Sequence, residues 1–173
     1  MSQTSINAVS IPSESTLLHF YQSVNLADAF AVTLPQGSST NPEVLGRFIF
    51  SHQPAWIGAL MKVRDTIVSL FGLKTAKALA LDNRSTRRIG FFRVYSVGER
   101  EVILGEDDNH LDFRLSLLCS EVAGATQLTM TTVVHCHNLL GRLYIFIISP
   151  FHRAVVKASL RRAAERGWPR AGQ

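Results

Sequence analysis

The chain has few of the features that mark disulfide-bonded, secreted or membrane-spanning proteins. Among its 173 residues are only two cysteines, Cys119 and Cys136, too few for a disulfide framework. Both lie in apolar, strand-like surroundings, so we expect buried, reduced thiols. The first residues show no basic segment followed by an apolar run, which is the pattern of a secretory signal. Together these absences predict a cytoplasmic location.

A long uninterrupted apolar run is also missing. A membrane-spanning helix needs roughly 20 mostly apolar residues, and residues 139–151 contain a glycine, an arginine, a serine and a proline. A buried core helix is therefore the favoured interpretation of this segment. The basic residues that follow it, between 153 and 166, suit the negative C-terminal end of a helix dipole. We expect no nucleic-acid binding, and peripheral contact with an anionic membrane is the alternative.

No pattern in the chain indicates a cofactor or a metal. The Gly-rich fingerprint of dinucleotide-binding domains is absent. His135 and His137 lie two residues apart in a predicted strand, so they share one face, and histidine pairs at this spacing can bind a metal. Because no third and fourth ligand accompanies them, we expect neither a metal site nor a cofactor.

The composition that is present is that of a single globular domain. Hydrophobic residues make up 46% and charged residues 18%, with a formal net charge of +5. Residues 1–24 begin with a polar, Ser-rich stretch and are predicted to form a mobile tail. We expect the folded domain to span residues 25–166 and a second tail to follow at 167–173.

The hydrophobic periodicity changes along the chain from strand to helix, then to strands, then to a long helix. A first strand is predicted at residues 28–34, and a first helix at 42–51, with Asn41 as its cap and Pro42 at its first position. The remaining predicted elements are a helix from Pro54 to Gly72, strands at residues 89–97, 101–105, 110–119 and 126–137, and at 138–165 either one long helix or two helices joined at a kink. Elements segregated in this way predict an α+β fold with helices on one face of an antiparallel sheet. The last helix is apolar on nearly all sides at its start, so we expect the rest of the chain to cover it nearly all round.

Several blocks of the sequence resemble one known family. They are Asp28–Phe30, Pro54–Arg64, Gly72–Lys74, Leu104–Asp108, His110–Arg114, Thr132–Val134, His137–Asn138, Gly141–Tyr144 and Pro150–Arg153. Over roughly residues 25–165 the chain is similar to the domain of unknown function 2867 family. The order of the predicted elements also looks like that of the START/Bet v 1-like superfamily, which includes polyketide cyclase-like proteins. The resemblance implies a helix-grip fold, in which a curved antiparallel sheet wraps around a long C-terminal helix. About five strands are visible in the sequence, fewer than the seven usual for this superfamily.

The resemblance implies a cavity between the curved sheet and the long helix. The leading hypothesis is a domain that binds a small hydrophobic ligand, either a lipid or an aromatic metabolite. The residues expected to line or contact this site are Phe91, Phe92, Phe113, Tyr144 and Phe146, with Arg64 and Arg142 as candidates to hold an acid group of the ligand. For the two arginines, a structural ion pair with Asp107, Asp108 or Asp112 is the favoured alternative.

Two further functions remain open. The first is an enzyme of the cyclase or dehydratase kind, in which His110 and Asp112, on one strand face, act as acid–base groups. The second is an interaction module that docks a reductase-like protein or a membrane surface through its basic helix end. Family members occur behind a reductase-like domain, so this chain is expected to stand alone or to meet such a partner in trans. A homodimer is the remaining expectation, because it would bury any uncovered part of the long helix.

Overall fold

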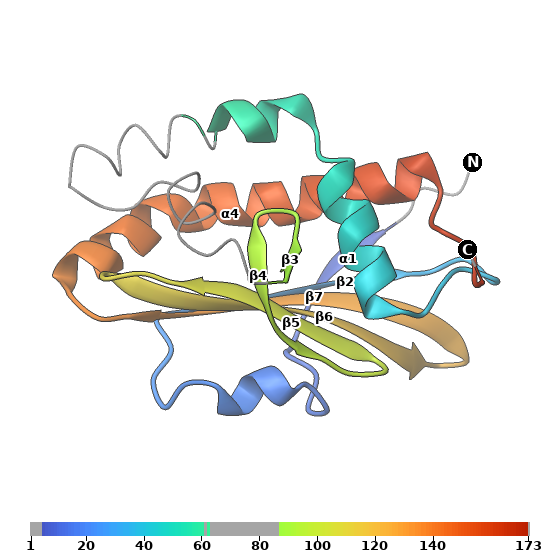
Figure 1. Ribbon diagram of the computed structural model, residues 1–173, viewed down its shortest axis with the longest axis horizontal. Coiled ribbons are helices and arrows are strands. Elements are labelled where there is room, and N and C mark those ends of the chain that lie inside the picture. The colour runs from blue at the N-terminus through green and yellow to red at the C-terminus, as the bar shows by residue number, and fades with distance from the viewer. Residues whose placement is uncertain (1–4, 61, 63–86, 173) are drawn as a thin grey trace.

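The computed structural model describes residues 5–60, 62 and 87–172, and in them the chain forms an α+β fold (Figure 1). The elements are β1 (Ile6–Val9), the 3-10 helix η1 (Thr16–His19), β2 (Leu26–Thr33), α1 (Pro42–Ser51), β3 (Arg88–Ile89), β4 (Phe92–Val97), β5 (Glu101–Asp107), β6 (Leu111–Val122), β7 (Ala125–Cys136) and α4 (Leu139–Arg166). Residues 55–60 are also helical. The rest of the helix predicted from Pro54 to Gly72, with Arg64, lies outside the described residues.

All seven strands belong to one antiparallel sheet with the order β1-β2-β7-β6-β5-β4-β3. Helices α1 and α4 cover one face, and the segment that contains η1 lies against the other (Figure 1). The central strands β6 and β7 are each 12 residues long and pair along their whole length. Leu115 and Leu117 of β6 point toward the helices and join the main core, which confirms the predicted alternation.

The sequence indicated about five strands because the two edge strands carry weak signals. Strand β1 has four residues and β3 has two. The segment predicted as one strand at residues 89–97 is divided by a turn between β3 and β4. Gly90 in this turn has φ 60°, a conformation that glycine adopts without strain.

The main core lies between the sheet, α1 and the second half of α4. Asn41 caps α1 as predicted, and its side-chain oxygen accepts a hydrogen bond from the N–H of Glu43 at 2.9 Å. Leu45 of α1 and Leu160 of α4 are both fully buried in this core. The predicted C-terminal tail at 167–173 is partly folded, since Trp168 is 8% exposed and packs into the same cluster.

The composition of α4 had suggested that the rest of the chain covers this helix nearly all round. The structure shows that it does not. Its buried residues are Gly141, Val156, Ser159, Leu160 and Ala163. Near its start, Leu139 and Phe146 are 81% and 80% exposed. By length and composition α4 is apolar enough to cross a membrane, a criterion that core helices of soluble proteins also meet. Among the described residues, the sheet therefore covers this helix on one side only.

Pro150 removes one backbone hydrogen bond from α4 without ending it. The helix runs continuously from Leu139 to Arg166, which decides between the two predicted forms in favour of one helix. Proline has no N–H to donate to the carbonyl four residues earlier, which is that of Phe146. The hydroxyl of Ser149 donates to this carbonyl instead, at 3.4 Å.

The start of α4 rests against the turn between β5 and β6. Asn138 caps the helix by accepting a hydrogen bond from the N–H of Gly141 at 3.0 Å. A Cβ atom added to Gly141 would lie 2.2 Å from the backbone oxygen of His110. The two main chains therefore approach so closely that only glycine fits at this position.

Part of the segment 1–24 that was expected to be mobile is folded onto the sheet. Strand β1 pairs with β2. Leu17 of η1 is 1% exposed and packs against Ile103 and Val133 on the face opposite α4. This face carries apolar residues of its own, and the N-terminal segment shields them from water.

Glu101 of β5 attaches this segment to the sheet from a buried position. Its carboxylate accepts hydrogen bonds from the hydroxyl of Ser15 at 2.6 Å, from the N–H and hydroxyl of Thr16 at 3.0 and 2.7 Å, and from the hydroxyl of Ser116 at 2.5 Å. Burial by itself raises the pKa of Glu101. The hydrogen bonds from Ser116, Ser15 and Thr16 outweigh this effect and hold the pKa below its ordinary value of 4.5.

We predict that Glu101→Gln loosens the N-terminal segment. Because the pKa of Glu101 is lower in the folded state, its carboxylate stabilises the fold above the ordinary pKa of 4.5, and this contribution is lost as the pH falls. The variant should lose about 1–3 kcal/mol of unfolding free energy at pH 7. On acidification from pH 7 to about pH 3, the unfolding free energy of the variant should fall by less than that of the wild type. Chemical unfolding at both pH values, with proteolysis to locate cleavage before β2, measures this. The exposed Glu121→Gln is the control, and an equal effect of both variants would contradict the prediction.

We also predict that Gly141→Ala destabilises the protein. Alanine normally favours a helix over glycine by about 0.5–1 kcal/mol. At this position its methyl group would displace the backbone of His110, for an expected net loss of about 1–3 kcal/mol. Gly58→Ala is the matched control, because a Cβ atom at this helical glycine meets nothing within 4 Å. Urea unfolding compares the two variants, and a stable Gly141→Ala protein would show that the close approach is not required.

Candidate functional site

A cavity of about 400 Å³ lies between the sheet and the first half of α4. Its lining residues are Leu26, Leu60, Phe91, Phe92, Glu106, Asp108, His110, Leu111, Phe113, Leu115, Thr132, Val134, Tyr144, Ile145, Ile147, Ile148, Phe151, His152 and Val155. Most of these side chains are aliphatic or aromatic. Ile147 and Phe151 line the cavity and are also 56% and 53% exposed, so the cavity opens to the surface beside α4.

Only some of the residues that were expected to contact a ligand line the cavity. Phe91, Phe113 and Tyr144 line the cavity, and their part in binding remains a prediction. Phe146 and Arg142 are exposed and do not line it, which corrects the positions expected for them. The lining stripe of α4 includes residues 144, 148, 152 and 155, and the 3.6-residue helical period points residues 142 and 146 away from it.

His110 lies in the cavity wall with Asp108 as its partner. Its Nδ1 atom is 3.4 Å from Oδ2 of Asp108, and the two side chains are 2% and 7% exposed. The ring of Tyr144 meets the imidazole edge to face, with ring centroids 5.6 Å apart. His110 precedes β6 and lies in the turn, so the strand alternation that was expected to place it beside Asp112 does not apply.

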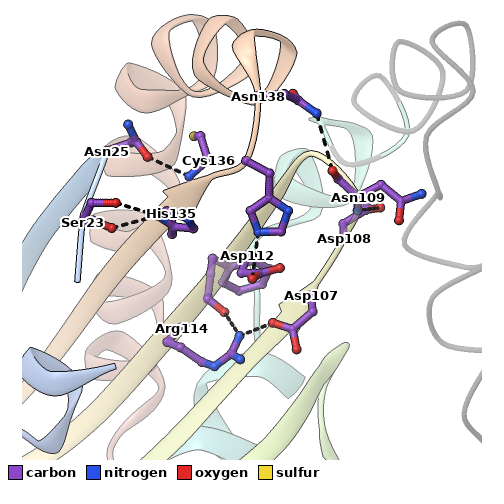
Figure 2. A network of polar contacts seen from close by, with 12 residues as sticks. Ser23, Asn25, Asp107, Asp108, Asn109, Asp112, Arg114, His135, Cys136 and Asn138 are labelled. Atoms are coloured by element: carbon purple, nitrogen blue, oxygen red, sulfur yellow. Dashed lines mark hydrogen bonds and ion pairs between the residues drawn. The ribbon is translucent and has the colours of Figure 1, made fainter. Parts of the chain in front are cut away.

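Asp112 lies on the opposite face of the sheet, where it contacts a different histidine (Figure 2). Its Oδ2 atom is 2.9 Å from Nε2 of His137. His135, two residues earlier on the same face, is held by the backbone oxygen of Ser23 at 2.9 Å. The predicted catalytic pair of His110 and Asp112 is therefore not a pair, because the sheet lies between the two side chains.

Arg114 shares this outer face and is buried there by aromatic rings of the N-terminal segment and β4. Its guanidinium donates to Asp107 at 2.7 Å and stacks on the ring of Tyr95, with the guanidinium carbon 3.7 Å from the centroid. Phe20 and Tyr21 lie 5.5 and 5.6 Å away. Burial raises the pKa of Tyr95 to about 12, and the hydrogen bond between its hydroxyl and Asp107 acts in the same direction. The arginine thus fastens the N-terminal segment and takes no part in the cavity.

A second polar corner of the cavity comes from β2, β7 and α4. His152 lines the cavity, and its Nε2 atom is 3.2 Å from Oδ1 of Asp28. Oδ2 of the same carboxylate is buried and lies 3.6 Å from Nε of Arg153, too far for a hydrogen bond. Asp28 pairs with Thr132 across β2 and β7, and Thr132 also lines the cavity. This corner therefore combines a carboxylate, an imidazole and a hydroxyl.

Sequence reasoning assigned no role to Asp28 or Thr132, although a signal was present. Asp28 precedes Phe30 and Val32 on the helix-facing side of β2, where a carboxylate is out of place among apolar residues. Thr132 holds the same position between Met130 and Val134 on β7. A polar residue on the apolar face of a strand indicates either a structural partner or a site.

Both cysteines are buried, and the described side chains form no metal-binding cluster. Cys119 and Cys136 are both buried and free, which confirms the prediction, and burial raises the pKa of Cys119 to about 11. Within the described part of the chain, no three His, Cys, Asp or Glu side chains are grouped so that they could hold a metal ion.

Comparison with known proteins identifies a family. A search of curated proteins and a search of solved structures each found no match. The family model described as "Protein of unknown function (DUF2867)" matches residues 20–159. This match covers β2 to the second half of α4, and therefore nearly all of the cavity wall. The chain belongs to the DUF2867 family.

Proposed function

We propose that this protein binds a small, mostly apolar molecule in the cavity between the sheet and α4. The observation that supports the proposal is the cavity itself, of about 400 Å³, with an apolar wall and few polar groups. Ligand sites in proteins have these dimensions and this composition. The proposal includes the START/Bet v 1-like relationship, in which a helix-grip fold holds its ligand at this place. A seven-stranded antiparallel sheet followed by a long C-terminal helix is consistent with that fold.

The walls of the cavity combine rigidity with apolar contact area. Phe92 and Phe113 meet edge to face with centroids 5.7 Å apart, and Phe50 supports Phe92 from behind at 5.1 Å. Leu111 and Val134 are 6% and 3% exposed in the central strands. Such aromatic and aliphatic walls gain free energy when a ligand displaces water from them.

We predict that Ile148→Trp weakens binding of the neutral fluorescent probe N-phenyl-1-naphthylamine by about tenfold or more. The larger side chain fills part of the cavity from α4. Phe146→Trp is the control, because this position lies on the same helix and does not line the cavity. Fluorescence titration gives both dissociation constants, with circular dichroism to confirm folding. Equal affinities of the two variants would place the probe outside the cavity, and no binding by the wild type would contradict the proposal.

Acid–base catalysis on a bound molecule is the second candidate. The supporting observation is the contact of 3.4 Å between His110 and Asp108, two nearly buried side chains in an otherwise apolar wall. A carboxylate that orients an imidazole is the arrangement used for proton transfer. A cyclisation or an elimination of water needs such a group and no further cofactor. Asp108 takes the role that the sequence had suggested for Asp112.

We predict that catalysis would change the molecules that copurify with the protein. Native mass spectrometry and denaturing extraction compare the wild type with Asp108→Asn and Asp112→Asn. For an enzyme, Asp108→Asn should retain unreacted substrate, which for a dehydratase is heavier than the product by one water. Asp112→Asn should match the wild type, because Asp112 lies on the outer face. Identical bound molecules in all three proteins would contradict catalysis and favour simple binding.

The interactions with other molecules and the cellular location expected from the sequence remain predictions. They are peripheral membrane contact, docking of a reductase-like partner, a homodimer and the cytoplasmic location. The exposed apolar side chains in the first half of α4 and the basic ones in its second half are the surface that such contacts would use.

A further inference from the structure

We infer that the ligand is a neutral, mostly apolar alcohol or phenol whose hydroxyl group bridges Thr132 and His152. This inference rests on the proposed binding function and names the chemical class that the cavity selects. It is carried by the polar corner that β2, β7 and α4 form.

Thr132 brings an unpaired hydroxyl group to the cavity wall. The residue is 4% exposed, and its Oγ1 atom has no hydrogen-bond partner within the described residues. Other buried hydroxyl groups in this part of the chain also lack a partner, those of Tyr21, Thr131 and Ser159, but none of them lines the cavity. A buried hydroxyl without a partner is unfavourable, so a ligand group that bonds to it gains affinity.

His152 supplies the complementary acceptor. Its Nε2 atom is 3.2 Å from Oδ1 of Asp28, whose side chain is 10% exposed. In a neutral imidazole whose Nε2–H donates to this carboxylate, Nδ1 carries the free lone pair. Asp28 is thus a positioning residue that fixes the tautomer, as carboxylates do for histidines in other sites.

The register of the sheet places Thr132 beside Asp28, the residue that His152 contacts. Asp28 lies directly opposite Thr132 in the β2–β7 pairing, so the side chains share one face with Cβ atoms about 5 Å apart. A ligand hydroxyl can accept from Thr132 and donate to His152 at once. A ketone can only accept, so it satisfies one of the two groups, and an alkane satisfies neither.

The charges around the cavity disfavour an acidic ligand. Glu106 and Asp108 line the wall, and none of the described lining residues is Arg or Lys. Among the described lining residues, a carboxylate ligand would therefore meet two like charges and no cation. A ligand ammonium would have to compete with cations already in place, because Glu106 is 3.2 Å from Arg88 and Asp28 is 3.6 Å from Arg153. A neutral hydroxyl avoids both costs.

The test compares four ten-carbon compounds that differ only in their polar end. 1-Decanol, 2-decanone, decanoate and decylamine displace N-phenyl-1-naphthylamine from the wild type at pH 8. We expect 1-decanol to bind about tenfold more tightly than the ketone and the acid. Thr132→Val keeps the volume and removes the hydroxyl from which both ligands accept, so both the alcohol and the ketone should bind about tenfold more weakly than to the wild type.

Thr131→Val is the matched control, because Thr131 also has a buried, unpaired hydroxyl but faces away from the cavity. It should bind both the alcohol and the ketone as tightly as the wild type does. Asp28→Ala should lose the preference for the alcohol, and Asp28→Asn, which retains an acceptor oxygen, should recover it. Tightest binding of decanoate or decylamine, or unchanged affinities for the alcohol and the ketone in Thr132→Val, overturns the inference while the binding function stands. No probe binding by the wild type removes the proposed function itself.

Discussion

The attachment of α4 to the sheet at its two ends determines the rest of the structure. Gly141 brings the first turn against the backbone of His110, and the buried residues of the second half begin at Val156. Between these two points no residue of the helix is fully buried. The cavity occupies this interval, since its lining residues on α4 run from Tyr144 to Val155. A space remains between the helix and the sheet because close packing is concentrated at the ends of the helix.

The sheet also divides the polar residues of the chain into two groups with different tasks. On the outer face, Glu101 and Arg114 hold the N-terminal segment with hydrogen bonds, ion pairs and ring contacts. On the inner face, the pairs of His110 with Asp108 and of His152 with Asp28 stand at separate corners of an apolar wall. Polar groups in such a wall are few, and each one therefore restricts which molecules can be bound.

Much of this arrangement could be predicted from the sequence, and the failures have physical causes. The alternation in β6 and β7 and the cap Asn41 are local signals, and they gave the α+β class and most element boundaries. The edge strands β1 and β3 were missed because four and two residues are too few for a period to show. The sequence pattern paired His110 with Asp112 instead of Asp108 because it placed residue 110 in the strand. Residues 108–110 form a turn, so the alternation of β6 does not extend to His110. Asp28 and His152 are far apart in the chain, and only the packing of α4 on β2 brings them together.

Pro150 has a mechanical consequence for this architecture. It lies within the part of α4 that has no fully buried side chain, and it leaves the carbonyl of Phe146 with only the long contact to Ser149. Proline inside a helix is a common cause of bending. Bending α4 at this point breaks no backbone hydrogen bond at that residue and disturbs neither end of the helix. Pro150 lies between two lining residues, Ile148 and Phe151, so a bend at this point would change the width of the cavity opening.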